Sequence, residues 1–194
     1  ELSLVFSTVV IIIGVAILGT YFYAAKFYLA DINYAKAQTM AVNSERTAAL
    51  EKAVRLNPAL SQYRTTLARV YMDEALTEMA KPQAEQDSAK IQILVATAIN
   101  QARMATELSP NQVANWETLG MVYREIRSVA SGAVEWGIRS FEQAISLEPS
   151  NPVLYTELGK LYALTEQGEK AKEQFALAIA KKPDYTDALI QDAL

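Results

Sequence analysis

The start of the chain differs from the rest in its pattern of apolar and polar positions. The segment LSLVFSTVVIIIGVAILGTYFYAA, residues 2–25, carries no charged side chain. A helix of that length rises about 36 Å at ~1.5 Å per residue, and the hydrocarbon core of a bilayer is about 30 Å thick. The pattern therefore predicts a hydrophobic, transmembrane-type helix over residues 1–25. The residues expected at the centre of its membrane or assembly core are Val10, Ile12, Val15 and Leu18.

The helical pattern continues past this apolar run. AAKFYLADINYAKAQTMA contains neither Gly nor Pro and is rich in helix formers, so we expect one rigid helix of about 40 residues in which residues 26–42 form an extension. Tyr21, Tyr23 and Tyr28 flank Lys26, as aromatic side chains do at a membrane–water interface. A cleavable signal peptide is disfavoured, because the run is too long and no A-x-A site follows it.

From residue 43 onward, small and large residues recur at fixed distances from Pro58, Pro110, Pro149 and Pro183. Twelve, eight and five residues before a proline the usual order is small, large and alanine. Six, nine, ten and thirteen residues after it the order is large, leucine, small and tyrosine. After Pro58 the large position holds Arg64, and the aromatic residue has moved to Tyr63. The positions that we expect to pack the repeats are Leu67, Ala68, Tyr71, Ala98, Ala105, Trp116, Leu119, Gly120, Tyr123, Phe141, Ala144, Tyr155, Leu158, Gly159, Tyr162, Ala171, Phe175 and Ala178.

This order resembles the tetratricopeptide repeat (TPR) pattern over residues 43–194. The resemblance implies an all-α solenoid of about 3–4 helix-turn-helix repeats, each made of a helix A and a helix B, on the long N-terminal helix. Small residues let the two helices approach closely, and we expect Gly159 to meet Ala178 across one pair. Proline lacks an N–H and ends helix B.

The spacing departs from the 34 residues that separate Pro149 from Pro183. The two preceding intervals are 39 and 52 residues long, which places insertions near 76–92 and 126–136. We expect extended helix ends joined by an exposed turn at KPQAEQDS. Helix B of a degenerate first repeat is SERTAALEKAVRL, with Asn43 or Ser44 as its N-cap. The predicted division is thus 1–25, 26–42 and a TPR domain over 43–194.

A weaker resemblance concerns the context of the repeats. NQVANWETLGMVYREI and GAVEWGIRSFEQAISLEPSNP are similar to the TPR tails of bacterial O-antigen-ligase-like membrane proteins, in which an apolar helix also leads into the repeats. The resemblance implies that the chain is the C-terminal part of a larger polytopic precursor. The catalytic loops of the ligase are not in this sequence, so its activity is not carried over.

Composition narrows the function classes. The chain has no Cys and no His, which excludes disulfides, Cys/His zinc sites, thiol nucleophiles and histidine proton relays. Its net charge of −4 and the lack of a basic stripe argue against a nucleic-acid partner. Carboxylates such as Glu135, Glu142, Glu157 and Glu173 fall on predicted polar helix faces. We therefore expect no catalytic site, no metal, no cofactor and no enzymatic activity.

The remaining candidate site is the concave face formed by the A helices. The residues expected to line it and bind a protein partner are Gln62, Arg69, Glu117, Met121, Arg124 and Lys160. Some TPR domains bind a C-terminal carboxylate there through a Lys/Asn clamp. The matching positions here hold Glu117 and Thr156, then Met121 and Lys160, so the clamp is not reproduced.

Two functions are compatible with these features. In the first, the chain self-associates through the apolar helix and TPR contacts, with a filament as one form of the assembly. This layout resembles type IV pilin subunits in plan but not in sequence. In the second, it is a membrane-anchored scaffold that binds a protein partner in its groove. Either function predicts a membrane-associated or cell-surface protein, of bacterial type, with the side of the membrane left open.

Overall fold

The structure, a computed structural model, describes residues 2–41 and 44–192. All regular elements in these ranges are helices, and the chain divides into two compact units, with the boundary in the sequence between Ala59 and Leu60. The predicted all-α TPR solenoid on a long N-terminal helix is confirmed. The finer division at residues 25 and 42 stays a prediction.

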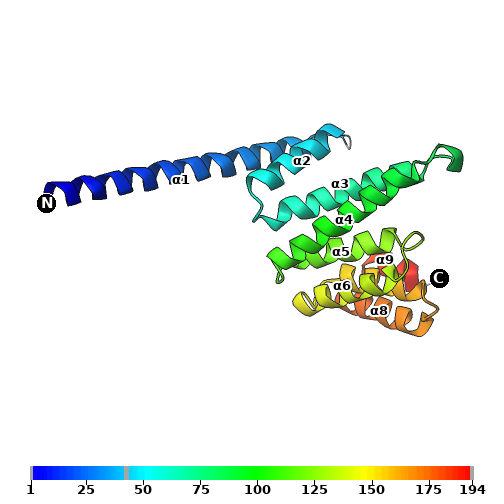
Figure 1. Cartoon of the computed structure of the whole chain (residues 1–194). Helices are drawn as coiled ribbons and strands as arrows, with labels where there is room; N and C mark the ends of the chain where they lie inside the picture. Colours follow the sequence, from blue (N-terminus) through cyan, green and yellow to red (C-terminus); the bar gives the residue numbers. More distant parts are fainter. Residues whose placement is uncertain (1, 42–43, 193–194) are drawn as a thin grey trace. The chain divides into compact units, whose positions relative to one another are not determined.

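The first unit begins with α1, Leu2–Gln38, an unbroken helix of 37 residues (Figure 1). Its large apolar side chains from Phe6 to Tyr28 are exposed, Ile12 to 62%. Residues 6–38 are long and apolar enough to cross a membrane, and none of the most apolar window is buried. The apolar run and the extension are therefore one element.

The second helix of this unit, α2, spans Ser44–Leu56 and contacts α1. Ala30 and Ala37, seven residues apart on α1, are fully buried, as are Leu50 and Ala53 on α2. Small residues at this spacing line one helix face and permit close approach. Asn43, one of the two predicted N-caps, lies outside the described residues.

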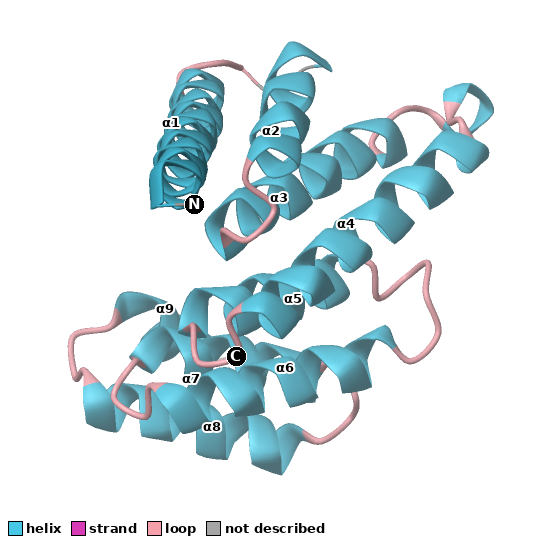
Figure 2. Ribbon diagram, turned by 60° about the vertical axis from the view of Figure 1, so that its left-hand side comes forward, coloured by secondary structure: helices cyan, strands magenta, loops and turns pink. Residues whose placement is uncertain are grey.

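The second unit contains three helix pairs and a final short helix (Figure 2). The pairs are α3, Ser61–Met79, with α4, Ser88–Leu108; α5, Val113–Glu125, with α6, Ala133–Leu147; and α7, Pro152–Ala163, with α8, Gly168–Lys181. The last helix is α9, Thr186–Asp192. Contacts between α3 and α5 and between α7 and α9 place A helices beside A helices, as a TPR solenoid requires.

Local sequence signals set the helix ends. Asn151 accepts a hydrogen bond from the Val153 N–H, and Pro152 occupies the first turn of α7. Gly132, with φ of 75°, precedes α6 in a left-handed conformation that glycine adopts easily. The longest turn joins α3 to α4 over residues 80–87, with a short 3-10 helix at Gln83–Glu85. Residues 80–85 are all exposed.

The glycines of the A helices make room for aromatic rings. A Cβ on Gly120 would lie 2.7 Å from the ring of Phe141, and one on Gly159 would lie closer still to the ring of Phe175. The atoms nearest to that Cβ position belong to Phe175, and the expected contact between Gly159 and Ala178 stays a prediction. Ala178 forms a cluster with Tyr155 and Ala188. The Phe175 ring occupies the space that a Cβ at position 159 would need, so this position requires glycine.

Most of the expected packing positions are buried. Tyr71, Trp116 and Tyr123 are half-buried, and they pack against the core rather than lie within it. The buried positions are Leu67, Ala68, Ala98, Ala105, Leu119, Gly120, Phe141, Ala144, Tyr155, Leu158, Gly159, Tyr162, Ala171, Phe175 and Ala178. The second unit thus has a continuous set of buried small and large residues.

Candidate interaction surface

A row of ion pairs connects three A helices. Arg124 at the end of α5 pairs with its neighbour Glu125 at 2.7 Å and with Glu157 of α7. Lys160, one turn along α7, pairs with Glu157 at 3.0 Å and with Asp187 of α9 at 2.8 Å. All five side chains are partly shielded from water, which strengthens such pairs relative to fully exposed ones. These ion pairs hold the five charged side chains in place on this face.

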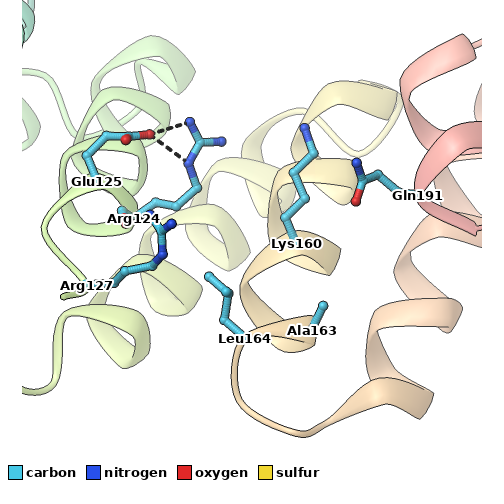
Figure 3. Close-up of a pocket in the computed structure, with 7 residues that line it drawn as sticks. All are labelled: Arg124, Glu125, Arg127, Lys160, Ala163, Leu164 and Gln191. Carbon is cyan, nitrogen blue, oxygen red and sulfur yellow. Dashed lines mark hydrogen bonds and ion pairs between the residues drawn. The ribbon is translucent and has the colours of Figure 1, made fainter. Parts of the chain in front are cut away.

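A charged cavity of about 480 Å³ opens beside this row. Figure 3 shows Arg124 reaching it from the end of α5, Arg127 from the turn that follows, Lys160 from α7 and Gln191 from α9. Arg127 is exposed and donates to the Arg124 carbonyl at 3.0 Å. Three cations and one carboxylate, Glu125, line the cavity, and Arg124 and Lys160 are also paired with Glu157 and Asp187 just outside it, so charges of both signs surround the opening. The residues that complete the wall are Ala163 and Leu164.

A second, apolar groove of about 340 Å³ lies between α3 and α5. Its apolar wall is made by Met72, Leu76, Met121 and Val122. Its polar residues are Arg69, Asp73, Thr118 and Glu125. Arg69 donates to the buried Thr118 hydroxyl at 2.9 Å, which ties α3 to α5 at one end of the groove. An apolar wall with a few charged groups at its edge suits a helix or peptide with one apolar face.

The structure divides the predicted concave-face residues between these two sites. Arg69 and Met121 line the apolar groove, whereas Arg124 and Lys160 line the charged cavity. Gln62 is exposed and Glu117 is half-buried, and neither lines either site. Whether the six bind a partner stays a prediction.

Sequence reasoning missed residues that lie off the repeat consensus. Glu125 is shared by both sites, and Arg127 and Gln191 belong to the charged cavity. The run REIR at residues 124–127 carried a signal, because it gathers three charges at one helix end. Nothing comparable marked Gln191, which reaches the cavity only because α9 contacts α7.

A buried carboxylate lies elsewhere, near the end of α3. Glu78 is 4% exposed and pairs with Lys81 at 2.8 Å and Lys90 at 2.9 Å, and it accepts the Asp87 N–H at 3.3 Å. Its hydrogen bonds to the two lysines lower its pKa to about 2. A carboxylate held ionised in this way is a structural clasp and is unsuited to donate a proton near neutral pH.

Arg64 is another buried charged side chain. Its side chain donates to Gln101 Oε1 at 2.9 Å and lies 3.5 Å from Met104 Sδ, both on α4. Burial lowers the pKa of the guanidinium, although not enough for an arginine to lose its proton. Within residues 2–41 and 44–192, no group of three or more His, Cys, Asp or Glu side chains is placed to hold a metal ion.

Comparison with solved structures identifies relatives in fold. The chain resembles "Crystal structure of MamA" with 20% identity and a TM-score of 0.59, covering 76% of this chain and 73% of that one. For "MamA MSR-1 C2" the identity is 18%, the TM-score 0.57 and the coverage 78% and 73%. For "MamA 41-end from Desulfovibrio magneticus RS-1" the identity is 15%, the TM-score 0.56 and the coverage 84% and 75%. MamA is a TPR-like helical solenoid, and likeness at this identity shows the fold alone. No protein-family model and no curated protein matches the chain.

Proposed function

We propose that this chain is a non-catalytic assembly protein that associates with copies of itself through α1 and through its TPR unit. One observation carries the proposal: α1 exposes large apolar side chains on every side from Phe6 to Tyr28. Such a surface is unfavourable in water, at about 25 cal/mol for each Å² of apolar area, and requires a covering partner. The α1 helices of further copies would supply that cover.

Exposed apolar residues in the TPR unit support the same function. Leu189 and Ile190 of α9 are about half exposed, as is Leu164 after α7. In a repeat array each repeat buries its apolar face against the next, so an uncovered face favours stacking of like units. Contacts of this head-to-tail kind generate open, helical assemblies when the rotation between copies does not close.

A membrane-anchored scaffold is the second candidate. It is favoured by the aromatic residues around Lys26, whose amine lies 5.9 Å from the centre of the Tyr23 ring. The apolar groove and the charged cavity would then receive a protein partner, whose docking surface is apolar next to groups of both charge signs. A place in a larger precursor of the O-antigen-ligase-like kind belongs with this candidate. Both candidates put the chain at a bacterial membrane or cell surface, without a cofactor or nucleic acid.

A charge at the middle of α1 separates the candidates. Ile12→Lys should cost about 2.5–3.5 kcal/mol per chain in a bilayer, where the lysine can still extend toward the interface. In a core of stacked α1 helices the charge recurs in every copy with no water within reach, so assembly should fail. The measurement is sedimentation and negative-stain imaging of the full chain.

The matched control is Ala25→Lys, which adds the same charge beside Lys26 at the end of the apolar run. We expect filaments with the parent and the control and none with Ile12→Lys. Ordered filaments of Ile12→Lys would contradict the assembly core. Dispersed particles from all three proteins, with the parent recovered in vesicles, would favour the anchored scaffold.

A further inference from the structure

A third cavity, of about 290 Å³, lies between α4, α5 and α6, the three helices adjacent in Figure 2. None of its lining residues belongs to the charged cavity or the apolar groove. It is therefore separate from the surface discussed above. Its lining residues include both tryptophans of the protein, Trp116 and Trp136.

One wall of this cavity is a stack of flat groups. The rings of Tyr123 and Trp136 lie 6.3 Å apart between centres and 24° from parallel. The Arg139 guanidinium lies over Trp136, 5.1 Å from the ring centre. Trp116 donates its indole N–H to the Pro110 carbonyl at 2.7 Å, so that ring is fixed in place. Trp136 nevertheless remains 53% exposed, which leaves a large aromatic surface open.

The polar groups around this wall differ in whether they already have a polar partner. Arg103 is paired with Glu107 at 3.5 Å, whereas Arg139 has no carboxylate within ion-pair distance in the described part of the chain. The Ser140 hydroxyl donates to the Trp136 carbonyl at 2.8 Å and is thereby occupied. Burial raises the pKa of the Tyr123 phenol, against a smaller effect of Arg103, so its hydroxyl stays protonated at neutral pH and can donate.

We propose that this cavity binds a small planar aromatic carboxylate, with its ring against Trp136 and Tyr123 and its carboxylate on Arg139. The rings offer stacking, and the unpaired guanidinium offers a charge-assisted hydrogen bond. The volume of about 290 Å³ is just below the roughly 300–1,000 Å³ typical of ligand cavities, which suits one ring with a short acidic chain. A peptide is disfavoured, because the lining comes from three helices around one cavity rather than from a groove along them.

The two tryptophans make the site measurable. We would titrate the full chain, in a nonionic detergent, with 3-phenylpropionate and follow tryptophan fluorescence. 3-Phenylpropionamide, which has the same shape without the charge, is the matched ligand. We expect saturable binding of the acid with a dissociation constant on the order of 1 mM or below, and binding of the amide weaker by about tenfold or more.

Substitutions locate the binding. Arg139→Gln should weaken binding of the acid by about tenfold and leave the amide unchanged, because only the charge-assisted contact is lost. Arg127 is an exposed arginine of the charged cavity, so Arg127→Gln should change the affinity for neither the acid nor the amide. Tyr123→Phe should weaken binding of the acid by a smaller factor than Arg139→Gln does. Circular dichroism checks that each variant is folded.

Three outcomes would overturn the proposal. Equal affinity for acid and amide would remove the role of charge, and unchanged binding by Arg139→Gln would place the ligand elsewhere. Binding of an acetylated Phe-Asp peptide without binding of the free acid would make the cavity a protein contact instead. All three are independent of filament formation, so failure here leaves the assembly proposal as it stands.

Discussion

At the scale of single residues, space decides which side chain is allowed. Gly120 and Gly159 lie against the rings of Phe141 and Phe175, where a Cβ would enter the van der Waals radius of the ring. Gly168, at the start of α8, has no heavy atom within 4 Å of the position of its Cβ. Glycines of identical chemistry therefore differ in what they tolerate.

We predict that Gly159→Leu destabilises the TPR unit by about 1–3 kcal/mol or more, because the added side chain must displace the Phe175 ring. The measurement is urea unfolding followed by circular dichroism. Gly168→Leu is the matched control and should change the free energy of unfolding by no more than about 0.5 kcal/mol. Equal effects of the two substitutions would mean that the Gly159–Phe175 contact does not limit packing.

The residue scale also shows what the sequence could and could not predict. The periodic order of small and large residues predicted that Gly159 and Ala178 face neighbouring helices, and both are buried. It did not identify the Phe175 ring as the nearest neighbour of Gly159, because a repeat pattern gives the face of a helix but not the offset between two helices. The Tyr123–Trp136 stack was missed for the same reason, since its rings come from α5 and α6.

At the scale of elements, the longest pair, α3 and α4, is fastened at one end by charge. Glu78 of α3 reaches Lys90 of α4 as well as Lys81 in the turn, and it accepts the N–H of Asp87, the N-cap of α4. An isolated buried carboxylate is unfavourable, but this one has three partners. The clasp compensates for a turn that is longer than those of the other pairs.

We predict a loss of stability in acid that depends on Glu78. Its pKa is about 2 in the folded protein and near 4.5 in an unfolded chain, so ionisation of Glu78 stabilises the fold above pH about 4.5. That contribution should disappear progressively as the pH falls from about 4.5 to about 2. Melting temperatures measured between pH 6 and pH 2 test this.

The control for this prediction is Glu78→Gln, which keeps the shape but cannot ionise. Its melting temperature should be lower than that of the parent at pH 6, and the difference should narrow toward pH 2. Glu107 is on the same helix pair, but its side chain is 63% exposed. The melting temperature of Glu107→Gln should therefore match that of the parent at each pH. A constant difference between Glu78→Gln and the parent at every pH would show that the charge is not what matters.

The sequence predicted elements better than sites. A proline shortly after each helix B marks its end, and the apolar run indicates one long helix, because both depend on local chain chemistry. The candidate sites depend on distant residues. Arg124 and Lys160 line one cavity together, yet Arg69 and Met121 line another, and Gln191 joins only through α9. The clasp at Glu78 likewise needs Lys90, twelve residues away across a turn.

At the scale of the whole molecule, the chain combines a unit that has buried apolar clusters with a helix whose large apolar side chains are exposed. Three clusters of buried residues lie in the second unit, and each is made by residues between Ala68 and Ala188. The exposed apolar side chains of α1 lie in the other unit. Solubility and folding should therefore be separable by truncation.

We predict that a chain lacking residues 1–25 remains helical, folds cooperatively and stays in solution without detergent. The reason is that the deleted segment adds exposed apolar surface and no part of the buried clusters named above. Thermal unfolding by circular dichroism and size-exclusion chromatography are the measurements. A truncated protein without a cooperative transition would show that the apolar segment is part of the fold.

The exposed turn at residues 80–87 has a practical consequence. It lies outside the three cavities described above, and the chain contains no cysteine. A cysteine placed at Glu85 would thus be the single thiol of the protein, on a turn where backbone changes are well tolerated. A gold cluster or spin label attached there would mark each copy at one known point. In images of an assembly, the spacing of those marks would give the rise and rotation from one copy to the next.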